Sequence, residues 1–214
     1  MSRKVRDLRK RFIVFCEGDT EFNYVEHMRL NQGVELALKP INMGGGGYAS
    51  FLDAIKAEAS NNCMAKFVII DFDRVLKHPG EKVKFIEIVD YCKLQNEYGK
   101  IPHFLIVDNP DFEYVSCLHI DQYKGQNVKQ YIESTLGFVD LNKFKTKEDI
   151  YEYLNSNNNS YSLMLERLKH KIVVNTYMVD KTNMDIQIID TQVNWDNENQ
   201  RGSNINEFFE VIDW

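Results

Sequence analysis

Two short apolar runs in this chain each end in a pair of acids. Glu17 and Glu21 follow the run FIVFC, and Asp71 and Asp73 follow the run FVII. Short β-branched and aromatic runs bounded by turn residues are typical of buried strands. In an open parallel α/β sheet the active crevice lies beyond the carboxyl ends of such strands. We therefore expect these acids to converge at one edge of a sheet.

A cluster of carboxylates of this kind predicts a site for Mg²⁺ or Mn²⁺. Hard divalent cations take oxygen ligands and are usually held by one or two carboxylates together with waters or substrate phosphates. Alternate residues of an extended segment point the same way, so Asp71 and Asp73 can be presented together while Phe72 packs behind them. Without a cation or a shared proton, the repulsion between two such carboxylates is uncompensated. The alternative for this motif is a solvated strand end.

Glu17 is followed by Gly18, which places its side chain at a turn rather than inside the sheet. Glu21 lies four residues further on. If a helix begins at Asp19 or Thr20, the carboxylates of Glu17 and Glu21 can face one cavity. The alternative for Glu21 is an acid stabilised by the dipole at the N-terminus of that helix.

The composition indicates a soluble globular protein of the cytoplasm. The chain has 214 residues and 43% hydrophobic content, enough to bury a substantial core. Its apolar stretches are strand-sized, far below the ~20 residues of a membrane span, and its N-terminal sequence leads into no signal-peptide core. The four cysteines are widely spaced without a Cys-x-x-Cys pair, so we expect reduced thiols rather than a zinc site or a disulfide framework.

The formal net charge of −6 argues against a protein that coats nucleic acid by charge alone, because such binding depends on Lys and Arg displacing counterions. It is compatible with a nuclease, since acids that hold a metal count as negative until the cation neutralises them. Lys143, Lys145 and Lys147 are predicted to contact substrate phosphates. The alternative for these lysines is a solvated helical face.

The order of the expected elements indicates an α/β fold with a mainly parallel sheet flanked by helices. Strands are expected at 11–16, 34–41, 66–70 and 103–107, and helices at 21–30, 50–59 and 81–98. Later helices are expected at 126–136, 147–155 and 161–171, with no clear strand before Ile186, an irregular tail over 191–203 and a last short helix after Asn204. These patterns predict a catalytic domain at 1–122 and a helical C-terminal extension packed on it at 123–214.

Three motifs occur in order along the first two thirds of the chain. They are Glu-Gly-x-Thr-Glu over 17–21, Asp-x-Asp over 71–73 and Asn-Pro-Asp-Phe-Glu over 109–113. Together they resemble the RloB-like proteins, a bacterial group of Toprim-type domains related to the OLD-family nucleases, over roughly residues 10–155. The resemblance implies a Toprim-like catalytic fold.

The resemblance also implies a role for each motif. Glu17 takes the position of the family's acid/base glutamate, and Glu21 that of the second acid of the OLD-like branch. The two aspartates of the Asp-x-Asp motif take the positions of metal ligands. The distinctive third motif gives a site role to Asn109 and Glu113, with Glu113 as a further catalytic candidate.

The chain departs from the family pattern at several positions. Asp111 stands where a small residue or Cys is frequent, Val115 lies near the position of a Trp, and Arg74 rather than a third acid follows the Asp-x-Asp motif. These departures leave the number of metal ions open. For Glu113 the alternative is a carboxylate at the start of a helix, and His119 is expected to be a packing residue rather than a base.

The sequence thus predicts a Mg²⁺- or Mn²⁺-dependent nuclease of DNA or RNA. The resemblance implies a place in bacterial anti-phage defence, with abortive infection as its outcome, and an ATPase as partner; a homo-oligomer is compatible with it. One alternative is a small-molecule phosphohydrolase or phosphotransferase, with Asp71 as nucleophile and a lysine nearby. Another alternative is a non-catalytic sensor or regulatory subunit of a defence complex.

Overall fold

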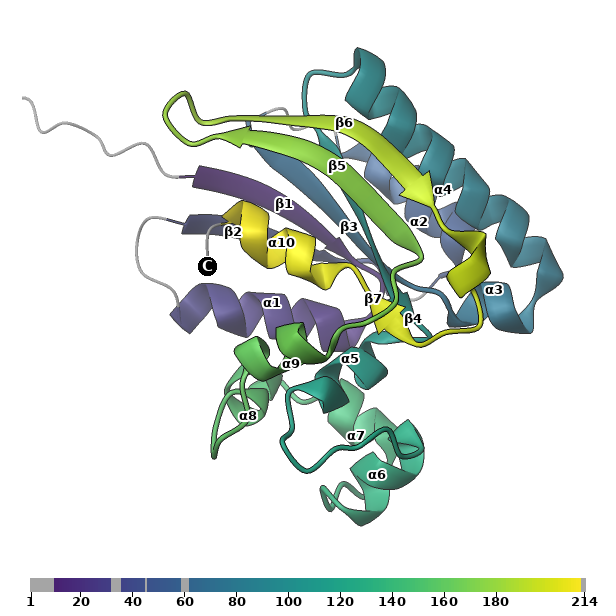
Figure 1. Ribbon diagram of the computed structural model, residues 1–214, viewed down its shortest axis with the longest axis vertical. Coiled ribbons are helices and arrows are strands. Elements are labelled where there is room, and N and C mark those ends of the chain that lie inside the picture. The colour runs from purple at the N-terminus through teal and green to yellow at the C-terminus, as the bar shows by residue number, and fades with distance from the viewer. Residues whose placement is uncertain (1–9, 32–35, 45, 59–61, 213–214) are drawn as a thin grey trace, which may run out of the picture.

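A five-stranded sheet lies at the centre of the computed structural model, which describes residues 10–31, 36–44, 46–58 and 62–212 (Figure 1). Its strands, in spatial order, are β2 (Leu36–Asn42), β1 (Lys10–Cys16), β3 (Ala65–Asp71), β4 (His103–Asn109) and β7 (Gly202–Ser203). The first four strands are parallel, and β7 pairs antiparallel with β4. The expected α/β fold with a mainly parallel sheet flanked by helices is confirmed.

The register of the sheet brings the acidic strand ends to one edge. Strand β1 pairs with β3 so that Cys16 lies opposite Ile69, and β3 pairs with β4 so that Asp71 lies opposite Asp108. Because these strands are parallel, the residues that follow them emerge on the same side. The first acids of both motifs therefore leave the sheet next to each other.

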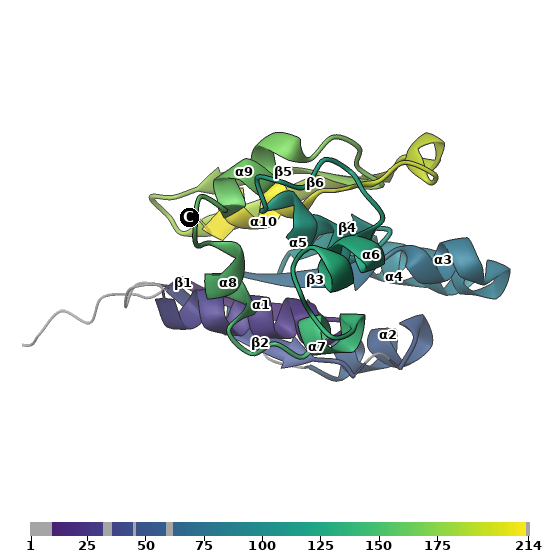
Figure 2. The same cartoon turned by 90° about the horizontal axis from the view of Figure 1, so that it is seen from below.

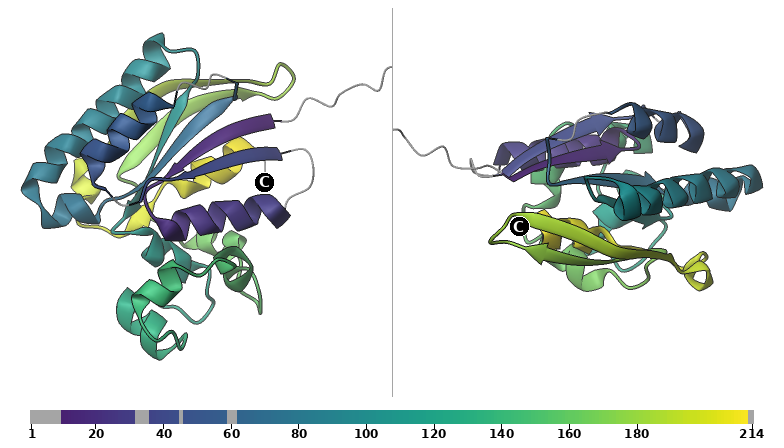
Figure 3. Two further views of the ribbon diagram at one scale, coloured as in Figure 1. Left: turned by 180° about the vertical axis from the view of Figure 1, so that it is seen from behind. Right: turned by 90° about the horizontal axis from the view of Figure 1, so that it is seen from above.

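Helices cover both faces of the sheet (Figures 1 and 3). Helices α1 (Asp19–Asn31), α5 (Phe112–Leu118) and α10 (Ile205–Ile212) pack on one face, and α2 (Tyr48–Ala57) and α4 (Pro79–Tyr98) pack on the other. Successive strand side chains point to opposite faces. In β1, Val14 accordingly joins the first core and Phe15 the second. Parts of the expected strand at 34–41 and helix at 50–59, namely 34–35 and 59, lie outside the described residues.

The C-terminal part is helical only at first. Four short helices, α6 (Val128–Ser134), α7 (Leu141–Lys145), α8 (Ile150–Leu154) and α9 (Tyr161–Arg167), are followed by the hairpin of β5 (Val173–Asp180) and β6 (Asp185–Val193) and by the 3₁₀ turn η1 (Trp195–Asn197). The expectation of no strand before Ile186 is wrong, because β5 begins at Val173. Figure 2 shows this hairpin and α10 on the same side of the molecule.

Strand β7 ties this C-terminal part into the central sheet. It pairs with the end of β4, where Asp108 lies opposite Ser203. Gly202 passes so close to His170 that a Cβ atom at this position would clash with the His170 carbonyl oxygen. The expected irregular tail over 191–203 therefore contains the end of β6, η1 and a strand of the main sheet.

The thiols and the helices bear on two further expectations. All four cysteines are free; Cys16, Cys92 and Cys117 are buried, and Cys63 is half-buried. The expected unpaired thiols are thus confirmed.

Within the described ranges, every helix is too short or too polar to cross a lipid bilayer.

Candidate functional site

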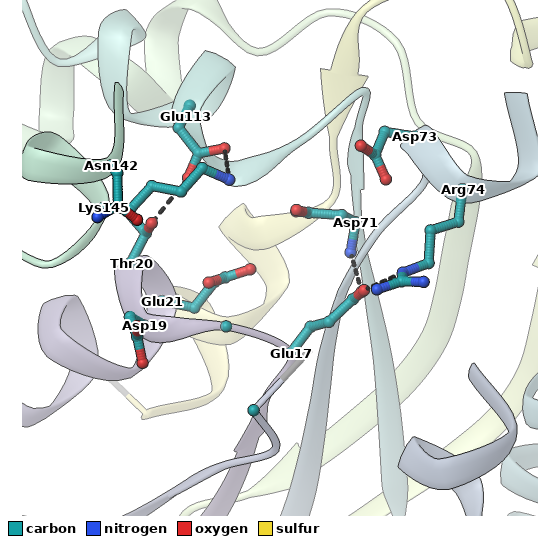
Figure 4. Close-up of a pocket in the computed structure, with 12 residues that line it drawn as sticks. Glu17, Asp19, Thr20, Glu21, Asp71, Asp73, Arg74, Glu113, Asn142 and Lys145 are labelled. Atoms are coloured by element: carbon teal, nitrogen blue, oxygen red, sulfur yellow. Dashed lines mark hydrogen bonds and ion pairs between the residues drawn. The ribbon is translucent and has the colours of Figure 1, made fainter. Parts of the chain in front are cut away.

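The acids of the sequence motifs line one cavity of about 300 Å³ beyond the carboxyl ends of β1 and β3 (Figure 4). Its lining comes from the β1–α1 turn, the loop after β2, the end of β3, α5 and α7. The lining residues are Glu17, Gly18, Asp19, Thr20, Glu21, Gly44, Asp71, Asp73, Arg74, Glu113, Asn142 and Lys145. The predicted convergence of Glu17, Glu21, Asp71, Asp73 and Glu113 is therefore observed.

Glu17 links the ends of β1 and β3. Its carboxylate accepts the main-chain N–H of Asp71 at 3.0 Å and the Nε–H of Arg74 at 3.0 Å. Burial raises the pKa of Glu17 above its ordinary value, although the Asp71 N–H and the Arg74 guanidinium act to lower it. Arg74, a departure from the family pattern, is thus the cation that holds Glu17 in place.

Asp71 is fixed at the end of β3 by contacts on both sides. Its Oδ1 accepts the N–H of Phe112, the first residue of α5, at 2.8 Å. Its main-chain carbonyl accepts the hydroxyl of Tyr48 from α2. Asp71 therefore sits where β3, α2 and α5 meet, and it lines the cavity (Figure 4).

Phe72 and Asp73 continue this turn into α3 (Asp73–Lys77). The N–H groups of Phe72 and Asp73 both donate to the carbonyl of Pro110, at 3.0 and 2.8 Å. The Phe72 ring is fully buried, and its centroid lies 5.3 Å from that of Phe85. Phe72 is thus the apolar residue that was expected to pack behind the two acids. Asp73 lies nearer the solvent and pairs with Lys77 at 2.6 Å.

Glu113 is held at the opposite wall of the cavity. The Thr20 hydroxyl donates to its Oε1 at 2.7 Å, and the Lys145 Nζ lies 2.8 Å from its Oε2. Burial acts to lower the pKa of Lys145, but the Glu113 carboxylate raises that pKa above its ordinary value. Lys145 is therefore a charged ammonium group at the cavity, contributed by a helix far along the chain.

Glu21 and Asp71 are the most strongly perturbed acids of the site. Burial raises the pKa of Glu21 well above its ordinary value, and the carboxylate of Glu113 raises it further. The pKa of Asp71 is likewise raised well above its ordinary value by burial and then by Glu21. A Cβ atom on Gly18 would lie 3.3 Å from the Glu21 carboxylate, so glycine leaves room for this acid to reach the cavity.

Two further acids do not line the cavity: Asp108, which no sequence motif included, and Asp111 of the third motif. Asp108 is fully buried; its Oδ1 accepts the Ser203 hydroxyl at 2.5 Å, while its Oδ2 has no hydrogen-bond partner. Burial raises the pKa of Asp108 to about 7. Burial and Glu113 raise the pKa of Asp111 to about 6, although its side chain caps α5 by accepting the N–H of Tyr114. An acid inside a buried strand is a signal that marks Asp108 in the sequence.

Some predicted site residues lie outside the cavity. The Asn109 amide donates to the carbonyls of residues 197, 198 and 200, so it holds the turn before β7 and does not line the cavity. Lys143 is exposed on α7, and Lys147 pairs with Asp149 at 2.6 Å; of the three predicted lysines only Lys145 reaches the cavity.

His119 is a packing residue, as expected. It is fully buried, its Nε2 lies 2.8 Å from the Tyr24 hydroxyl, and its Nδ1 lies 3.2 Å from the Val115 carbonyl. Burial lowers the pKa of His119 to about 4, so the ring is neutral, with Nδ1 as donor and Nε2 as acceptor.

The chemistry of the lining suits a hard divalent cation. Carboxylate oxygens are the ligands that Mg²⁺ and Mn²⁺ prefer, and the repulsion among these buried acids is relieved when a cation binds. Across the described part of the chain, no three His, Cys, Asp or Glu side chains stand close enough to form a complete ligand set. Mg²⁺ needs no such set, because it keeps several waters and is held by one or two carboxylates plus substrate phosphates. The donors present therefore fit this class of cation.

Comparison of the chain with protein-family models, with curated proteins and with solved structures finds no match.

Proposed function

We propose that this protein is a Mg²⁺- or Mn²⁺-dependent nuclease with a Toprim-like fold that cleaves phosphodiester bonds in DNA or RNA. The observation that carries the proposal is the convergence of the five predicted acids on one cavity, from two strand ends and three helices. Clustered acids with raised pKa values in a cleft are typical of functional sites. Clustered carboxylates at strand ends are the usual means of holding cations for phosphoryl chemistry.

One or two of the carboxylates of Glu17, Glu21, Asp71 and Asp73 would hold the cation, together with waters and substrate phosphates. When bound, the cation neutralises charge on the phosphate and lowers the pKa of a coordinated water. The Glu17 carboxylate is preorganised by the hydrogen bond that it accepts from the Asp71 main-chain N–H, and the Asp71 carboxylate by the one that it accepts from the Phe112 N–H. Glu17, where it is not committed to the cation, serves as the acid/base group, because its raised pKa makes its carboxylate a better proton acceptor.

Glu113 and Lys145 form the opposite wall and contact the substrate. The Lys145 ammonium is a point charge that attracts a phosphate oxygen, and Glu113 with Thr20 holds it in position. Glu113 is the further catalytic candidate on this wall. The two walls together place the scissile phosphate between the acids on one side and the Lys145 ammonium on the other.

The resemblance to RloB-like proteins supports the biological setting of the proposal. It implies a bacterial anti-phage defence system of the cytoplasm in which cleavage of nucleic acid leads to abortive infection. The same resemblance implies an ATPase partner encoded with the nuclease. The mainly parallel sheet with acids at the ends of its first and third strands is compatible with the Toprim assignment.

The direct test is a cleavage assay on purified protein. Plasmid, single-stranded DNA and total tRNA are incubated with Mg²⁺, with Mn²⁺ and with EDTA. We expect cleavage of at least one substrate with a divalent cation and none with EDTA. Glu17→Gln and Asp71→Asn serve as inactive controls of nearly constant volume, and cleavage that persists in both variants would rule out the proposed site.

A small-molecule phosphohydrolase is the second candidate, and one observation favours it. This reading needs a lysine near the Asp71 nucleophile, and Lys145 lines the same cavity. Hydrolysis of p-nitrophenyl phosphate without cleavage of any nucleic acid would select it. The third alternative is a non-catalytic sensor. A sensor would keep its biological activity in the Glu17→Gln and Asp71→Asn variants, whereas the nuclease and the phosphohydrolase would lose theirs.

A further inference from the structure

We propose that the nuclease cleaves phosphodiester bonds in an unpaired, flexible nucleic-acid strand rather than in an intact duplex; this inference rests on the proposed function. The first observation is the depth of the cavity. Asp19, Gly44 and Asn142 at its rim are exposed, whereas Glu21 and Glu113 on its floor are each 2% exposed. A phosphate must therefore enter the cavity to come near Glu21 and Glu113, while the half-buried Asp71 and Asp73 line the way in.

Two walls of the cavity are packed parts of the fold. One is the β1–α1 turn and the other is α7 (Figure 4). The α7 residue Phe144 is fully buried, with its ring centroid 5.2 Å from that of Phe138. On the same helix, Lys145 pairs directly with Glu113 of α5 beside it. The α7 wall is thus anchored on both sides.

The size of the cavity favours a flexible strand. A volume of about 300 Å³ lies at the lower end of pockets that enclose small molecules. Duplex DNA has a persistence length of about 50 nm and keeps its phosphates on the outside of a stiff rod. A single strand bends locally, so it can turn one phosphate into the cavity while its bases splay out over the rim.

The charge of the site favours the same substrate. Arg74 and Lys145 are the basic side chains of the lining. Against them stand the acids Glu17, Asp19, Glu21, Asp71, Asp73 and Glu113. Duplex DNA carries about one negative charge per 1.7 Å of its axis, a higher density than a single strand. An acidic cavity in a chain of net charge −6 therefore repels a duplex more strongly than a single strand.

A matched set of substrates tests the inference. One labelled oligonucleotide is offered as a single strand, as a blunt duplex and as a duplex with an internal gap, in DNA and RNA versions, with Mn²⁺. We expect the single strand and the gap to be cut about tenfold or more faster than the duplex, because unpairing adds to the cost of reaching the site. Equal rates on single strand and duplex overturn the inference and leave the proposed function intact. No cleavage of any form overturns both.

Binding provides a readout that does not depend on turnover. Fluorescence anisotropy with the Asp71→Asn variant, which blocks cleavage, compares the same oligonucleotides at one salt concentration. We expect tighter binding of the single strand than of the duplex. Equal or reversed affinities count against the inference, and the preference between the DNA and RNA versions identifies the source of the strand.

Variants of the α7 wall link the selectivity to the cavity. Phe144→Ala removes the anchor of α7, and Asn142→Ala trims the rim without touching the core. The rate ratio of single strand to duplex should fall in Phe144→Ala and fall less in Asn142→Ala. Circular dichroism establishes that each variant is folded. An unchanged ratio in folded Phe144→Ala, or in Asn142→Ala where the first variant does not fold, overturns the inference.

Discussion

The Glu17 carboxylate accepts the main-chain N–H of Asp71 at 3.0 Å, so the acids that end β1 and β3 are fixed relative to each other by a direct hydrogen bond. The same carboxylate is paired with Arg74 at 3.0 Å. Glu17 therefore both fixes the end of β3 and forms an ion pair with Arg74. A substitution at Glu17 that keeps the hydrogen bond but removes the charge separates these two functions.

Glu17→Gln keeps an acceptor for the Asp71 N–H but removes the negative charge. We expect nuclease activity to fall about 100-fold or more, the size of a typical general acid–base contribution. Stability should change by about 1 kcal/mol or less, because the lost ion pair with Arg74 is partly exposed. Cleavage assays and thermal melts without metal measure both effects. A fall in melting temperature of many degrees would mark Glu17 as structural.

Asp108→Asn should stabilise the metal-free protein in a pH-dependent manner. The folded-state pKa of Asp108 is raised to about 7 from an ordinary value near 3.8, so the folded protein binds more protons than the unfolded chain between these values. The Asp108 contribution to stability is therefore fully present below about pH 4 and is lost as the pH rises to about 7. At about 1.4 kcal/mol per pKa unit, the loss is on the order of a few kcal/mol.

Thermal melts in EDTA from pH 4 to pH 8 check this prediction. The melting temperature of Asp108→Asn relative to the unmodified protein should rise across that range and then level off. His103 and His119, whose pKa values are lowered to about 4, titrate in both proteins and cancel in the difference. Asp53→Asn on the exposed surface of α2 is the matched control. A pH-independent difference for Asp108→Asn would contradict a buried, protonated carboxyl.

Lys145→Gln and Lys143→Gln form a matched pair on one helix. Lys145 lines the cavity, whereas Lys143 is exposed beside it. Each lost phosphate contact lowers the slope of log affinity against log salt by about 0.7 for single strands. We expect that decrease, with weaker binding, in Lys145→Gln and an unchanged slope in Lys143→Gln. The reverse result would move the phosphate contact from the cavity to the outer face of α7.

Trp195→Ala tests whether the C-terminal part supports the acid turn. The centroid of the Trp195 ring lies 6.4 Å from that of Phe72 and 5.9 Å from that of Phe85. The Lys82 ammonium lies 4.3 Å from the centroid of the Trp195 ring. Removing it should cost about 2–3 kcal/mol of stability, somewhat less than a fully buried Trp. Because Phe72 lies between the proposed ligands Asp71 and Asp73, we also expect Trp195→Ala to bind Mn²⁺ more weakly, with a higher Mn²⁺ concentration at half-maximal binding.

Trp195→Phe is the rescue variant for this position. It keeps an aromatic contact with Phe72 and should restore Mn²⁺ affinity measured by calorimetry. A loss of stability in Trp195→Ala with unchanged Mn²⁺ affinity would mean that the ring supports the fold but does not position the acids.

The acids of the cavity were predictable because their signals are local. An apolar run that ends in acids identifies a strand end in a few residues, and the parallel arrangement of α/β sheets brings such ends together. Glu17, Glu21, Asp71 and Asp73 were placed by this reasoning. Phe72 is buried as expected, but the extended segment from which this was argued is wrong, because the chain turns at Phe72 (φ −93°, ψ −7°) into α3.

The rest of the site depends on contacts between distant segments. Lys145 reaches the cavity from a five-residue helix whose position no local pattern specifies. Strand β7 has two residues, too few to show a period, and it exists because it pairs with β4. Strand β5 alternates buried and exposed residues only in part, and it follows directly on a helical pattern. The predicted site role of Asn109 came from the resemblance, whereas its amide is occupied by the turn before β7.

The pairing of β7 with β4 also orders events during synthesis. Ser203, which donates to Asp108, is translated 95 positions after it. Strands β1, β3 and β4 and their acids therefore emerge from the ribosome well before the residues that complete this edge of the sheet. A chain still being translated holds the acids without Gly202, Ser203 or the turn that Asn109 binds. The sheet edge beside Asp108 is therefore one of the last parts of the described fold that can form during translation.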